Sequence, residues 1–339
     1  MIPILKEILA INPKVQIIGS PWTPPRWMKV NNLTDLQPYD HWTSGQLNPA
    51  LYQDYALYFA KWLQAMKDNG LNVNAITIQN EPLNRGNSAS MYMGWDEQLA
   101  FIKKALGKTL RDKGFAEVKI YLFDHNYNYD NMPSQQQYPL HIYKDTEASQ
   151  YITGAAYHNY GGNPDELNNI HNQYPNKELI FTESSIGTWN DGRNLERRLT
   201  EDMQELGIKT LNNHCKAVMV WNLMLDEHGA PNREGGCKTC FGAVDIQTSD
   251  YKTMQRNSHY YVISHLSSVI KQGATRIGVE KTTDDNVQCT AFQNPDGSLA
   301  CVLLNKKKEA AYLTLSTGKQ YFSYEVPANS VVSFLIPKI

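Results

Sequence analysis

The feature that most constrains the fold is a regular alternation of β-rich and amphipathic helical runs over the first two thirds of the chain. Six runs are rich in apolar, β-branched and aromatic residues: residues 15–20, 73–79, 118–124, 152–158, 178–183 and 217–222. Between them, apolar residues recur every three or four positions, as from Leu51 to Met66, where Gly70 then stops the pattern. This alternation predicts βα units around a parallel sheet.

The sequence pattern changes after Gly273. Short β-rich runs follow at residues 275–280, 287–294, 299–305, 310–316 and 330–336, and NPDG at residues 294–297 is a turn sequence. Regularly spaced short strands of this kind predict a small antiparallel β-sandwich. We therefore expect two domains, residues 1–272 and residues 273–339.

The number of strands in the first region limits its architecture. A (β/α)8 TIM barrel needs eight parallel strands, and only six are visible. An open doubly wound sheet would normally carry a Gly-rich phosphate loop after its first strand, which this chain lacks. The region is therefore either an unusual open sheet or a barrel whose first two strands are absent.

Composition and charge exclude several function classes. The formal net charge is −2 and no long Lys/Arg run occurs, so no nucleic-acid partner is expected. No apolar run approaches the roughly 20 residues of a membrane span, and the N-terminus lacks the layout of a secretory signal. The 20 Tyr and 7 Trp residues provide flat surfaces on which sugars can stack, although core packing is their commoner use.

The five cysteines are too few and too scattered for a disulfide scaffold. Cys237 and Cys240, in GGCKTC, could form a local disulfide, supply half of a metal site or simply lie in a loop. Because no second CxxC and no nearby pair of histidines accompanies them, we expect no metal site. We also expect no cofactor.

Polar and aromatic side chains follow every predicted strand of the first region. Because reactive groups gather beyond the carboxyl ends of parallel strands, these positions are the candidate site. They read Ser20-Pro21-Trp22, Asn80-Glu81-Pro82, Asp124-His125-Asn126, His158-Asn159-Tyr160, Glu183-Ser184-Ser185 and Trp221-Asn222. Two of them are carboxylates, Glu81 and Glu183, and glycoside hydrolysis needs such a pair: one protonates the leaving oxygen while the other attacks or stabilises the anomeric carbon.

The neighbouring side chains suit the same chemistry. Asn80 can donate to a sugar hydroxyl, Trp22 and Trp221 can support a sugar ring, and Tyr160 or His158 can orient a carboxylate. Each residue taken alone also has a structural alternative. A glutamate can cap a helix or form an ion pair, Trp221 can serve packing, His158 can be a structural residue of the core, and Asp124 can cap the segment that follows it. No serine nucleophile elbow, HExxH or Walker loop competes, and no strand end carries the lysine of an aldolase.

Five segments resemble, in order and spacing, the motifs of glycoside hydrolase family 30, which contains glucosylceramidases and microbial β-1,6-glucanases. They are SPWTPPRWMK, TIQNEP, AYHNYGG, FTESSIG and WNLMLDEHGAPN. The resemblance implies that Glu81 is the general acid/base and Glu183 the nucleophile. It places Trp22, Asn80, Asp124, Tyr160, Trp221 and Asn222 around the sugar. It implies double displacement with retention, with the two carboxyl groups about 5–5.5 Å apart and the pKa of Glu81 raised.

Substrate and compartment follow from the same resemblance. The segment NREGGCKTCFGAVDI, residues 232–246, is similar to the bacterial β-1,6-glucanase branch, which implies an endo-β-1,6-glucanase acting on β-linked glucan. A glucosylceramidase or β-glucosidase is the alternative within the family; an impaired carbohydrate-binding remnant is the alternative of another class. A xylanase is less favoured, since no arginine is obviously placed for a glucuronate. We expect a monomer, secreted or periplasmic or at the cell surface if full-length.

The beginning of the chain departs from the family pattern. Family members begin with strands of the sandwich and barrel strands one and two, whereas this chain opens in the helix before strand three. The resemblance therefore implies that two βα units are missing at the N-terminus. The Arg and Asp that those segments supply for sugar hydroxyls have no counterpart here.

Overall fold

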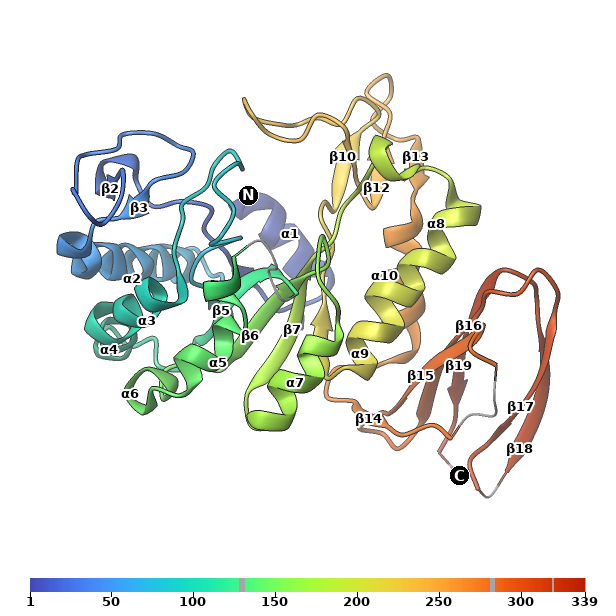
Figure 1. Cartoon of the computed structure of the whole chain (residues 1–339). Helices are drawn as coiled ribbons and strands as arrows, with labels where there is room; N and C mark the ends of the chain where they lie inside the picture. The colour runs from blue at the N-terminus through green and yellow to red at the C-terminus, as the bar shows by residue number, and fades with distance from the viewer. Residues whose placement is uncertain (128–131, 281–283, 319, 339) are drawn as a thin grey trace. The chain divides into compact units, whose positions relative to one another are not determined.

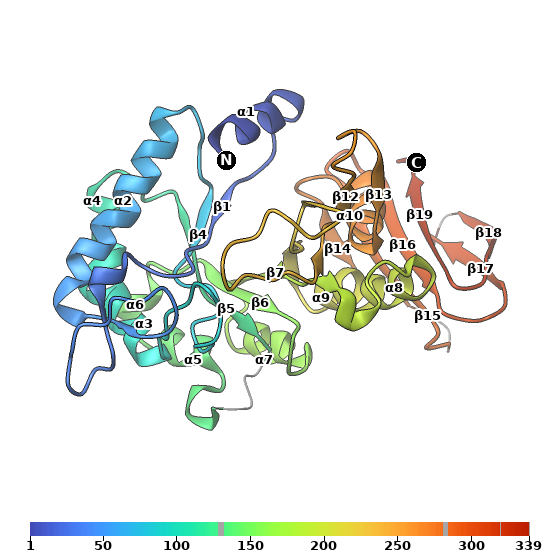
Figure 2. The ribbon, with the colours of Figure 1, turned by 90° about the horizontal axis from the view of Figure 1, so that it is seen from above.

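The computed structural model describes residues 1–127, 132–280, 284–318 and 320–338. The chain forms two compact units (Figures 1 and 2). The first comprises residues 1–180 and 234–236, and the second comprises residues 181–233 and 237–339.

The first unit is built on a parallel sheet with the strand order β1-β4-β5-β6-β7, where β7 begins in this unit and ends in the second (Figure 2). The strands are β1 (Ile18–Gly19), β4 (Ala75–Thr77), β5 (Lys119–Asn126), β6 (Gly154–His158) and β7 (Glu178–Glu183). The helices are α1 (Ile2–Ile11), α2 (Tyr52–Asp68), α3 (Trp95–Phe101), α4 (Gly107–Asp112), α5 (Tyr138–Tyr143), α6 (Thr146–Ser149) and α7 (Asp165–Gln173), with a π-helical turn at Ile102–Leu106. Short 3₁₀ turns (Arg26–Met28, Pro49–Leu51, Pro133–Gln135) and a hairpin of β2 (Lys29–Val30) and β3 (Gln46–Leu47) complete it.

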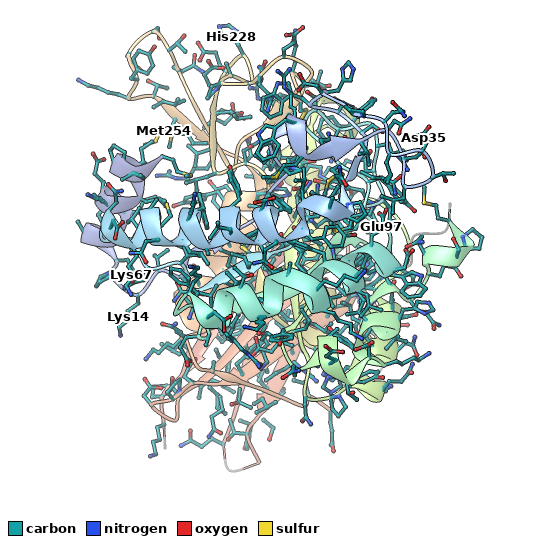
Figure 3. All side chains as sticks on the ribbon, turned by 90° about the vertical axis from the view of Figure 1, so that its left-hand side faces the viewer. Lys14, Asp35, Lys67, Glu97, His228 and Met254 are labelled. Carbon is teal, nitrogen blue, oxygen red and sulfur yellow. A yellow bond between two sulfur atoms is a disulfide. The ribbon has the colours of Figure 1, made fainter. Side chains whose placement is uncertain are left out.

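Helix α2 follows directly from its apolar pattern. Tyr55, Phe59, Leu63 and Met66 are all buried, because residues three or four positions apart lie on one face of a helix. The ring of Tyr55 stacks on Phe101 of α3 at a centroid distance of 5.4 Å. The helix ends at Asp68, where Gly70 takes a φ of +77° that suits glycine. Figure 3 shows α2 along its length, with Lys67 near its C-terminal end and Glu97 on α3.

Strand β5 contains a β-bulge close to its carboxyl end. Phe123 pairs with Ala156 of β6, and His125 pairs with the next residue, Tyr157, so Asp124 is an extra residue on β5. Phe123 and Asp124 both have positive φ, 72° and 62°. A bulge redirects the side chains that follow it, because it breaks the strict alternation of faces along a strand.

The second unit contains β9 (Cys215–Val218), which pairs beside the end of β7 through a hydrogen bond from Met219 N–H to the Phe181 carbonyl. Two small sheets follow, one of β10 (Met224–Asp226), β12 (Val244–Ile246) and β13 (Met254–Arg256), the other of β8 (Ile186–Gly187) and β11 (Cys240–Phe241). The helices are α8 (Leu195–Asp202), α9 (Thr210–Asn212) and α10 (Ser258–Val269), with a π-helical segment at Met203–Lys209 and a 3₁₀ turn at Thr188–Asn190.

The C-terminal part of the second unit is an antiparallel β-sandwich. One sheet has the order β14-β15-β16-β19 and the other pairs β17 with β18. The strands are β14 (Thr275–Ile277), β15 (Val287–Gln293), β16 (Leu299–Asn305), β17 (Ala311–Ser316), β18 (Tyr321–Val326) and β19 (Ser330–Ile336). Phe334 of β19 contacts the rings of Phe322 and Tyr324 of β18 at 5.4 and 5.3 Å, so aromatic packing joins the two sheets.

All six strands predicted in the first region are present, as β1, β4, β5, β6, β7 and β9. The five predicted strands of the sandwich are present too, and β18 is a sixth that the sequence did not predict. No helix among the described residues is both long and apolar enough to span a membrane. The domain boundary at 272/273 stays a prediction.

Candidate active site

Glu81 is held in an unusual backbone conformation just beyond β4. Its φ is +42°, in the left-handed region that a glutamate rarely adopts. Its N–H donates to the carbonyl of Asp124 at 2.9 Å, and its own carbonyl accepts from the N–H of Asn84 at 2.9 Å. These bonds hold the backbone in a strained geometry, and backbone strain of this kind concentrates at functional sites.

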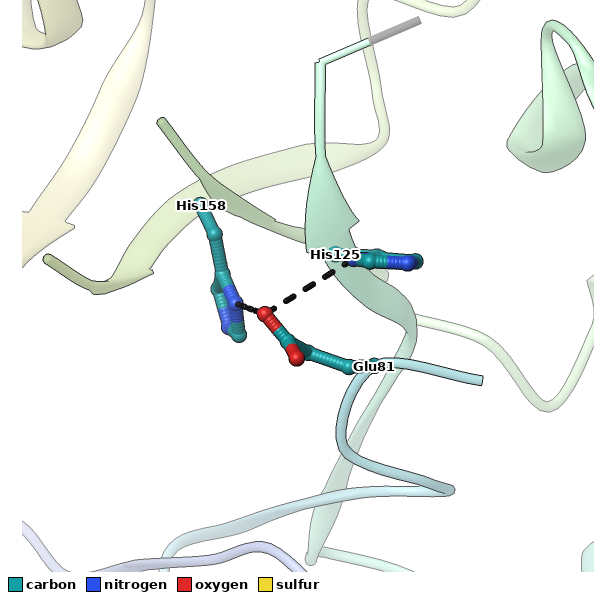
Figure 4. Close-up of side chains that lie close together, drawn as sticks. All are labelled: Glu81, His125 and His158. Carbon is teal, nitrogen blue, oxygen red and sulfur yellow. Dashed lines mark hydrogen bonds and ion pairs between the residues drawn. The ribbon is translucent and has the colours of Figure 1, made fainter. Parts of the chain in front are cut away.

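Both carboxylate oxygens of Glu81 have hydrogen-bonding neighbours. Oε2 accepts from the side-chain amides of Asn84 and Asn87, at 2.8 and 2.5 Å. Oε1 lies 3.2 Å from Nδ1 of His158 and 3.9 Å from Nδ1 of His125 (Figure 4). The Glu81 side chain is buried, so these partners replace water around it.

Asp124 supports His158 from the opposite side of the imidazole ring. Its Oδ1 lies 3.1 Å from Nε2 of His158, and its Oδ2 accepts from the hydroxyls of Ser20 and Thr77, both at 2.7 Å. Asp124 and His158 are both buried. With Asp124 as a carboxylate, its Oδ1 can only accept, so Nε2 of His158 is then the donor.

The contact between Nδ1 of His158 and Oε1 of Glu81 needs one proton between the two atoms. With Nε2 donating to Asp124, either Nδ1 of His158 or Oε1 of Glu81 must carry a proton if the 3.2 Å contact is a hydrogen bond. Since Oε2 is occupied by two amide donors, Oε1 is the oxygen that takes part. Glu81 and His158 thus form a pair that shares one transferable proton.

The pKa of Glu81 is lowered to about 2. Burial alone would raise it, but the hydrogen bond and charge of His158, the charge of His125 and the amide of Asn84 together outweigh burial. Burial lowers the pKa of His125 itself to about 4, so His125 is neutral at neutral pH and His158 dominates there. The raised pKa expected for Glu81 is therefore wrong for this arrangement, in which the lowered pKa favours the carboxylate form of Glu81.

His125 contributes to the cluster only because of the bulge in β5. Asp124 and His125 are consecutive, and in a regular strand their side chains would lie on opposite faces. With Asp124 as an extra residue, Asp124 contacts His158 while His125 approaches Glu81. The end of β5 thus supplies two side chains to one cluster.

The predicted residues of the second unit follow β7 and β9. Glu183 is the last residue of β7 and is half-buried. The N–H of Trp221 donates to the Ser184 carbonyl at 2.8 Å, and Ser185 and Trp221 form a parallel bridge. The Asn222 carbonyl accepts from the N–H of Ala243 at 2.7 Å. Within this unit, Glu183, Trp221 and Asn222 therefore lie at the ends of two neighbouring strands.

Three further predicted residues lie in the first unit, and one of them, Tyr160, contacts the cluster. The ring of Tyr160 is exposed and meets the ring of His158 edge to face at 6.0 Å. Asn80 is buried and its N–H donates to the Pro21 carbonyl at 2.8 Å. Trp22 is half-buried, and its carbonyl accepts from the amide of Gln79 at 2.6 Å.

The sequence patterns predict some residues of the cluster and not others. Of those predicted, Glu81, Asp124 and His158 are joined directly by hydrogen bonds. His125 lies at a predicted strand end, but the sequence indicates no role for it, because the orientation of its side chain depends on the bulge. Asn84 and Asn87 follow the NEP motif by two and five residues, and nothing in their spacing indicates that both reach Glu81.

Comparison with known families decides what kind of protein this is. The model of the glycosyl hydrolase family 30 TIM-barrel domain matches residues 1–270, and that of the family 30 β-sandwich domain matches residues 273–334. The chain belongs to glycosyl hydrolase family 30. It is therefore an O-glycosyl hydrolase of a retaining family, with the barrel-plus-sandwich architecture that the resemblance implied.

Individual relatives place the chain within family 30. It is 33% identical over 355 residues to the endo-1,6-β-D-glucanase BGN16.3 of Trichoderma harzianum, covering 100% of this chain and 68% of that protein. The lysosomal acid glucosylceramidase of Mus musculus is 26% identical, covering 98% of this chain and 65% of that protein. The solved structure of the endo-β1,6-glucanase BT3312 is 60% identical with a TM-score of 0.97, covering 100% of this chain and 74% of that chain.

Proposed function

We propose that the chain hydrolyses internal β-1,6 linkages of glucan with retention of anomeric configuration. The observation that carries this proposal is the 60% identity, over the whole of this chain, to the endo-β1,6-glucanase BT3312. The fungal endo-1,6-β-D-glucanases are 29–33% identical, whereas the mouse glucosylceramidase is 26% identical. A polysaccharide substrate is therefore favoured over a glycolipid.

Glu81 is proposed as the general acid/base of this reaction. In the first step it protonates the oxygen of the leaving sugar, and in the second it accepts a proton from the attacking water. Its contact with His158 supports this role, because a proton shared across 3.2 Å can move to Oε1 when substrate arrives. The low pKa of the carboxyl then favours its return to the ionised form needed in the second step.

Glu183 is proposed as the nucleophile. Its carboxylate attacks the anomeric carbon and forms a glycosyl ester, which water then hydrolyses. We further propose that Trp22, Asn80, Asp124, His158, Tyr160, Trp221 and Asn222 serve substrate binding, with Asp124 acting through His158. The functional division into a barrel of residues 1–272 and a sandwich of residues 273–339 is supported by the separate family matches.

The disulfide between Cys237 and Cys240 supports an oxidising location outside the cytoplasm. Cys215, Cys289 and Cys301 take part in no disulfide among the residues that the structure describes. Thiol titration of denatured protein taken from its native host would therefore detect three thiols under this proposal. A count of five would contradict export.

The activity test compares defined substrates. Purified chain is incubated with the β-1,6-glucan pustulan, gentiobiose, a β-1,3-glucan, xylan, glucosylceramide and an aryl β-glucoside. The expected result is rapid loss of pustulan chain length with oligosaccharide products, and a first-formed anomer of the β configuration by NMR. Release of glucose alone, or preference for glucosylceramide, would favour the alternatives within the family.

Matched variants separate catalysis from binding. Glu81→Gln and Glu183→Gln are compared with Glu201→Gln, whose carboxylate is exposed on α8 and pairs with Arg197 and Arg198. Only the first two should lose pustulan hydrolysis, while circular dichroism shows all three folded. Calorimetric binding of pustulan oligosaccharides by the unaltered chain without any turnover would instead identify a carbohydrate-binding remnant.

A further inference from the structure

Three side chains with metal-binding atoms meet in the first unit. Glu81 follows β4, His125 lies in β5 and His158 ends β6 (Figure 4). One potential ligand atom from each residue lies within 4.8 Å of those of the other two. The three residues are buried, so their relative positions are fixed by the strands that carry them.

The two separations from Oε1 of Glu81 are close to those of a tetrahedral metal site. Zinc binds histidine nitrogen and carboxylate oxygen at about 2.0–2.2 Å, which places neighbouring ligand atoms roughly 3.3–3.6 Å apart. Oε1 of Glu81 lies 3.2 Å from Nδ1 of His158 and 3.9 Å from Nδ1 of His125. An ion could therefore be accommodated by small rotations of the two imidazole rings.

The surroundings of His158 have the arrangement found around metal-binding histidines. A ligating imidazole usually donates its other ring nitrogen to a carboxylate, which fixes the tautomer and orients the ring. Nε2 of His158 faces Oδ1 of Asp124 at 3.1 Å, and Asp124 is itself held by Ser20 and Thr77. Nδ1 of His158 is thereby directed at Glu81.

Charge and ligand type indicate which ion would bind. Glu81 and Asp124 are two buried carboxylates, whose combined charge a divalent cation would balance. Two imidazoles with one carboxylate suit Zn²⁺ or Cu²⁺ rather than Ca²⁺ or Mg²⁺, which prefer oxygen ligands.

We propose that Glu81, His125 and His158 form an inhibitory binding site for a late first-row divalent transition metal such as Zn²⁺. The ion takes the place of the proton shared by Glu81 and His158 and coordinates Oε1 of Glu81. Glu81 can then neither give nor accept a proton. The inhibitory effect of the ion rests on the acid/base role proposed for Glu81, whereas the binding of the ion does not.

Direct binding is measured without substrate. Metal-free chain is titrated with Zn²⁺ by calorimetry, and with Co²⁺ as a spectroscopic substitute whose visible absorption is intense in tetrahedral sites. One ion per chain is expected for the unaltered protein. Each of His125→Ala and His158→Ala should weaken binding at least about tenfold, because each removes a ligand. Unchanged affinity in both variants would overturn the site.

The matched control is His228, an exposed histidine whose Nε2 lies 3.5 Å from Glu227 and which therefore offers an imidazole and a carboxylate at the surface (Figure 3). His228→Ala should leave the affinity for Zn²⁺ unchanged. Loss of the bound ion in this variant would assign binding to the surface pair and overturn the proposal.

A crystallographic measurement keeps the proposal testable if the histidine variants fail to fold. Crystals of the unaltered chain soaked with ZnCl₂ should show an anomalous peak within bonding distance of Glu81, His125 and His158. Anomalous peaks found only elsewhere would overturn the site.

Inhibition is tested separately from binding. Hydrolysis of pustulan should fall in proportion to Zn²⁺ occupancy and return when EDTA removes the ion. Full activity at full occupancy would overturn the inhibitory role. A chain without any hydrolase activity would contradict the proposed function, while calorimetry and crystallography would still decide whether the metal binds.

Discussion

Nδ1 of His158 lies 3.2 Å from Oε1 of Glu81, while Nε2 of the same ring faces Asp124 at 3.1 Å. His158 thus connects two carboxylates, and removing it should change the protonation of Glu81. In His158→Asn we expect the pKa of Glu81 to rise above its ordinary value of 4.5, because burial raises it and the main opposing influence is gone. NMR titration of the carbon-labelled glutamate side chains, assigned with Glu81→Gln, measures this; His228→Asn is the control.

The free energy of unfolding of His158→Asn should also depend on pH differently from that of the unaltered chain. The pKa of Glu81 is lower in the folded chain than its ordinary value, so its ionised form contributes stability above about pH 4.5. That contribution is lost as the pH falls toward 2. The difference in unfolding free energy between the unaltered chain and His158→Asn should therefore shrink from pH 5 toward pH 2, as measured by urea denaturation. A constant difference would contradict the pairing.

Glu81→Gln should affect substrates according to their leaving groups. Hydrolysis of pustulan should fall by about 10²–10⁴-fold, because the leaving sugar then departs without a proton donor. A dinitrophenyl β-glucoside needs less protonation of its leaving group and should lose much less in its first step. Added azide should restore turnover and yield a glycosyl azide. Equal losses on both substrates without azide rescue would argue against an acid/base role.

Glu183→Gln should reduce hydrolysis of both substrates by about 10³-fold or more, because no glycosyl ester can form. A 2-deoxy-2-fluoro glucoside with a good leaving group should trap that ester on the unaltered chain. Mass spectrometry of peptides should then place the label on Glu183, which ends β7. A label on another carboxylate would reassign the nucleophile.

Asp124→Ala should lower the free energy of unfolding by about 1–3 kcal/mol, since Ser20, Thr77 and His158 all lose a buried acceptor. Asp124→Asn should cost less, because asparagine retains one acceptor oxygen and tolerates the φ of +62° at this position. Urea denaturation at neutral pH compares the two. Equal costs would indicate that the three donors find other partners.

Removing the disulfide by the double change Cys237→Ser and Cys240→Ser should lower the free energy of unfolding by about 2 kcal/mol, as expected for a very short closed loop. Dithiothreitol should have the same effect on the unaltered chain and none on the variant. Thermal unfolding with and without reductant tests both statements. A reductant effect that persists in the variant would point to the other cysteines.

The strands that the sequence predicted best are those with continuous apolar runs. β7 was predicted with its observed bounds, Glu178–Glu183, because its core Leu179, Ile180 and Phe181 are all buried. β9 begins two residues earlier than the predicted run and ends at Val218, four residues before that run does, although Met219 and Trp221 still bond to the backbone of Phe181 and Ser184. β18 was missed because most of its residues are exposed, and its pairing with β17 defines it instead.

The candidate site was predictable where it depends on strand ends alone. Glu81, Asp124 and His158 follow or end buried strands, and the structure joins them. The lowered pKa of Glu81 was not predictable, because it depends on amide and imidazole groups that reach the carboxylate through loop geometry. The disulfide was one of three open interpretations of Cys237 and Cys240, and only their positions in space decide among them.

The extra residue in β5 also determines how relatives of this chain should be compared. An insertion of one residue gives the end of this strand two usable side chains, Asp124 and His125, where a regular strand would offer one. A relative that lacks the insertion could pair all its other strand residues in the same way. It would still lose either the carboxylate that supports His158 or the second imidazole near Glu81. The length of this short segment, counted residue by residue, would then separate family members more sharply than their overall identity does.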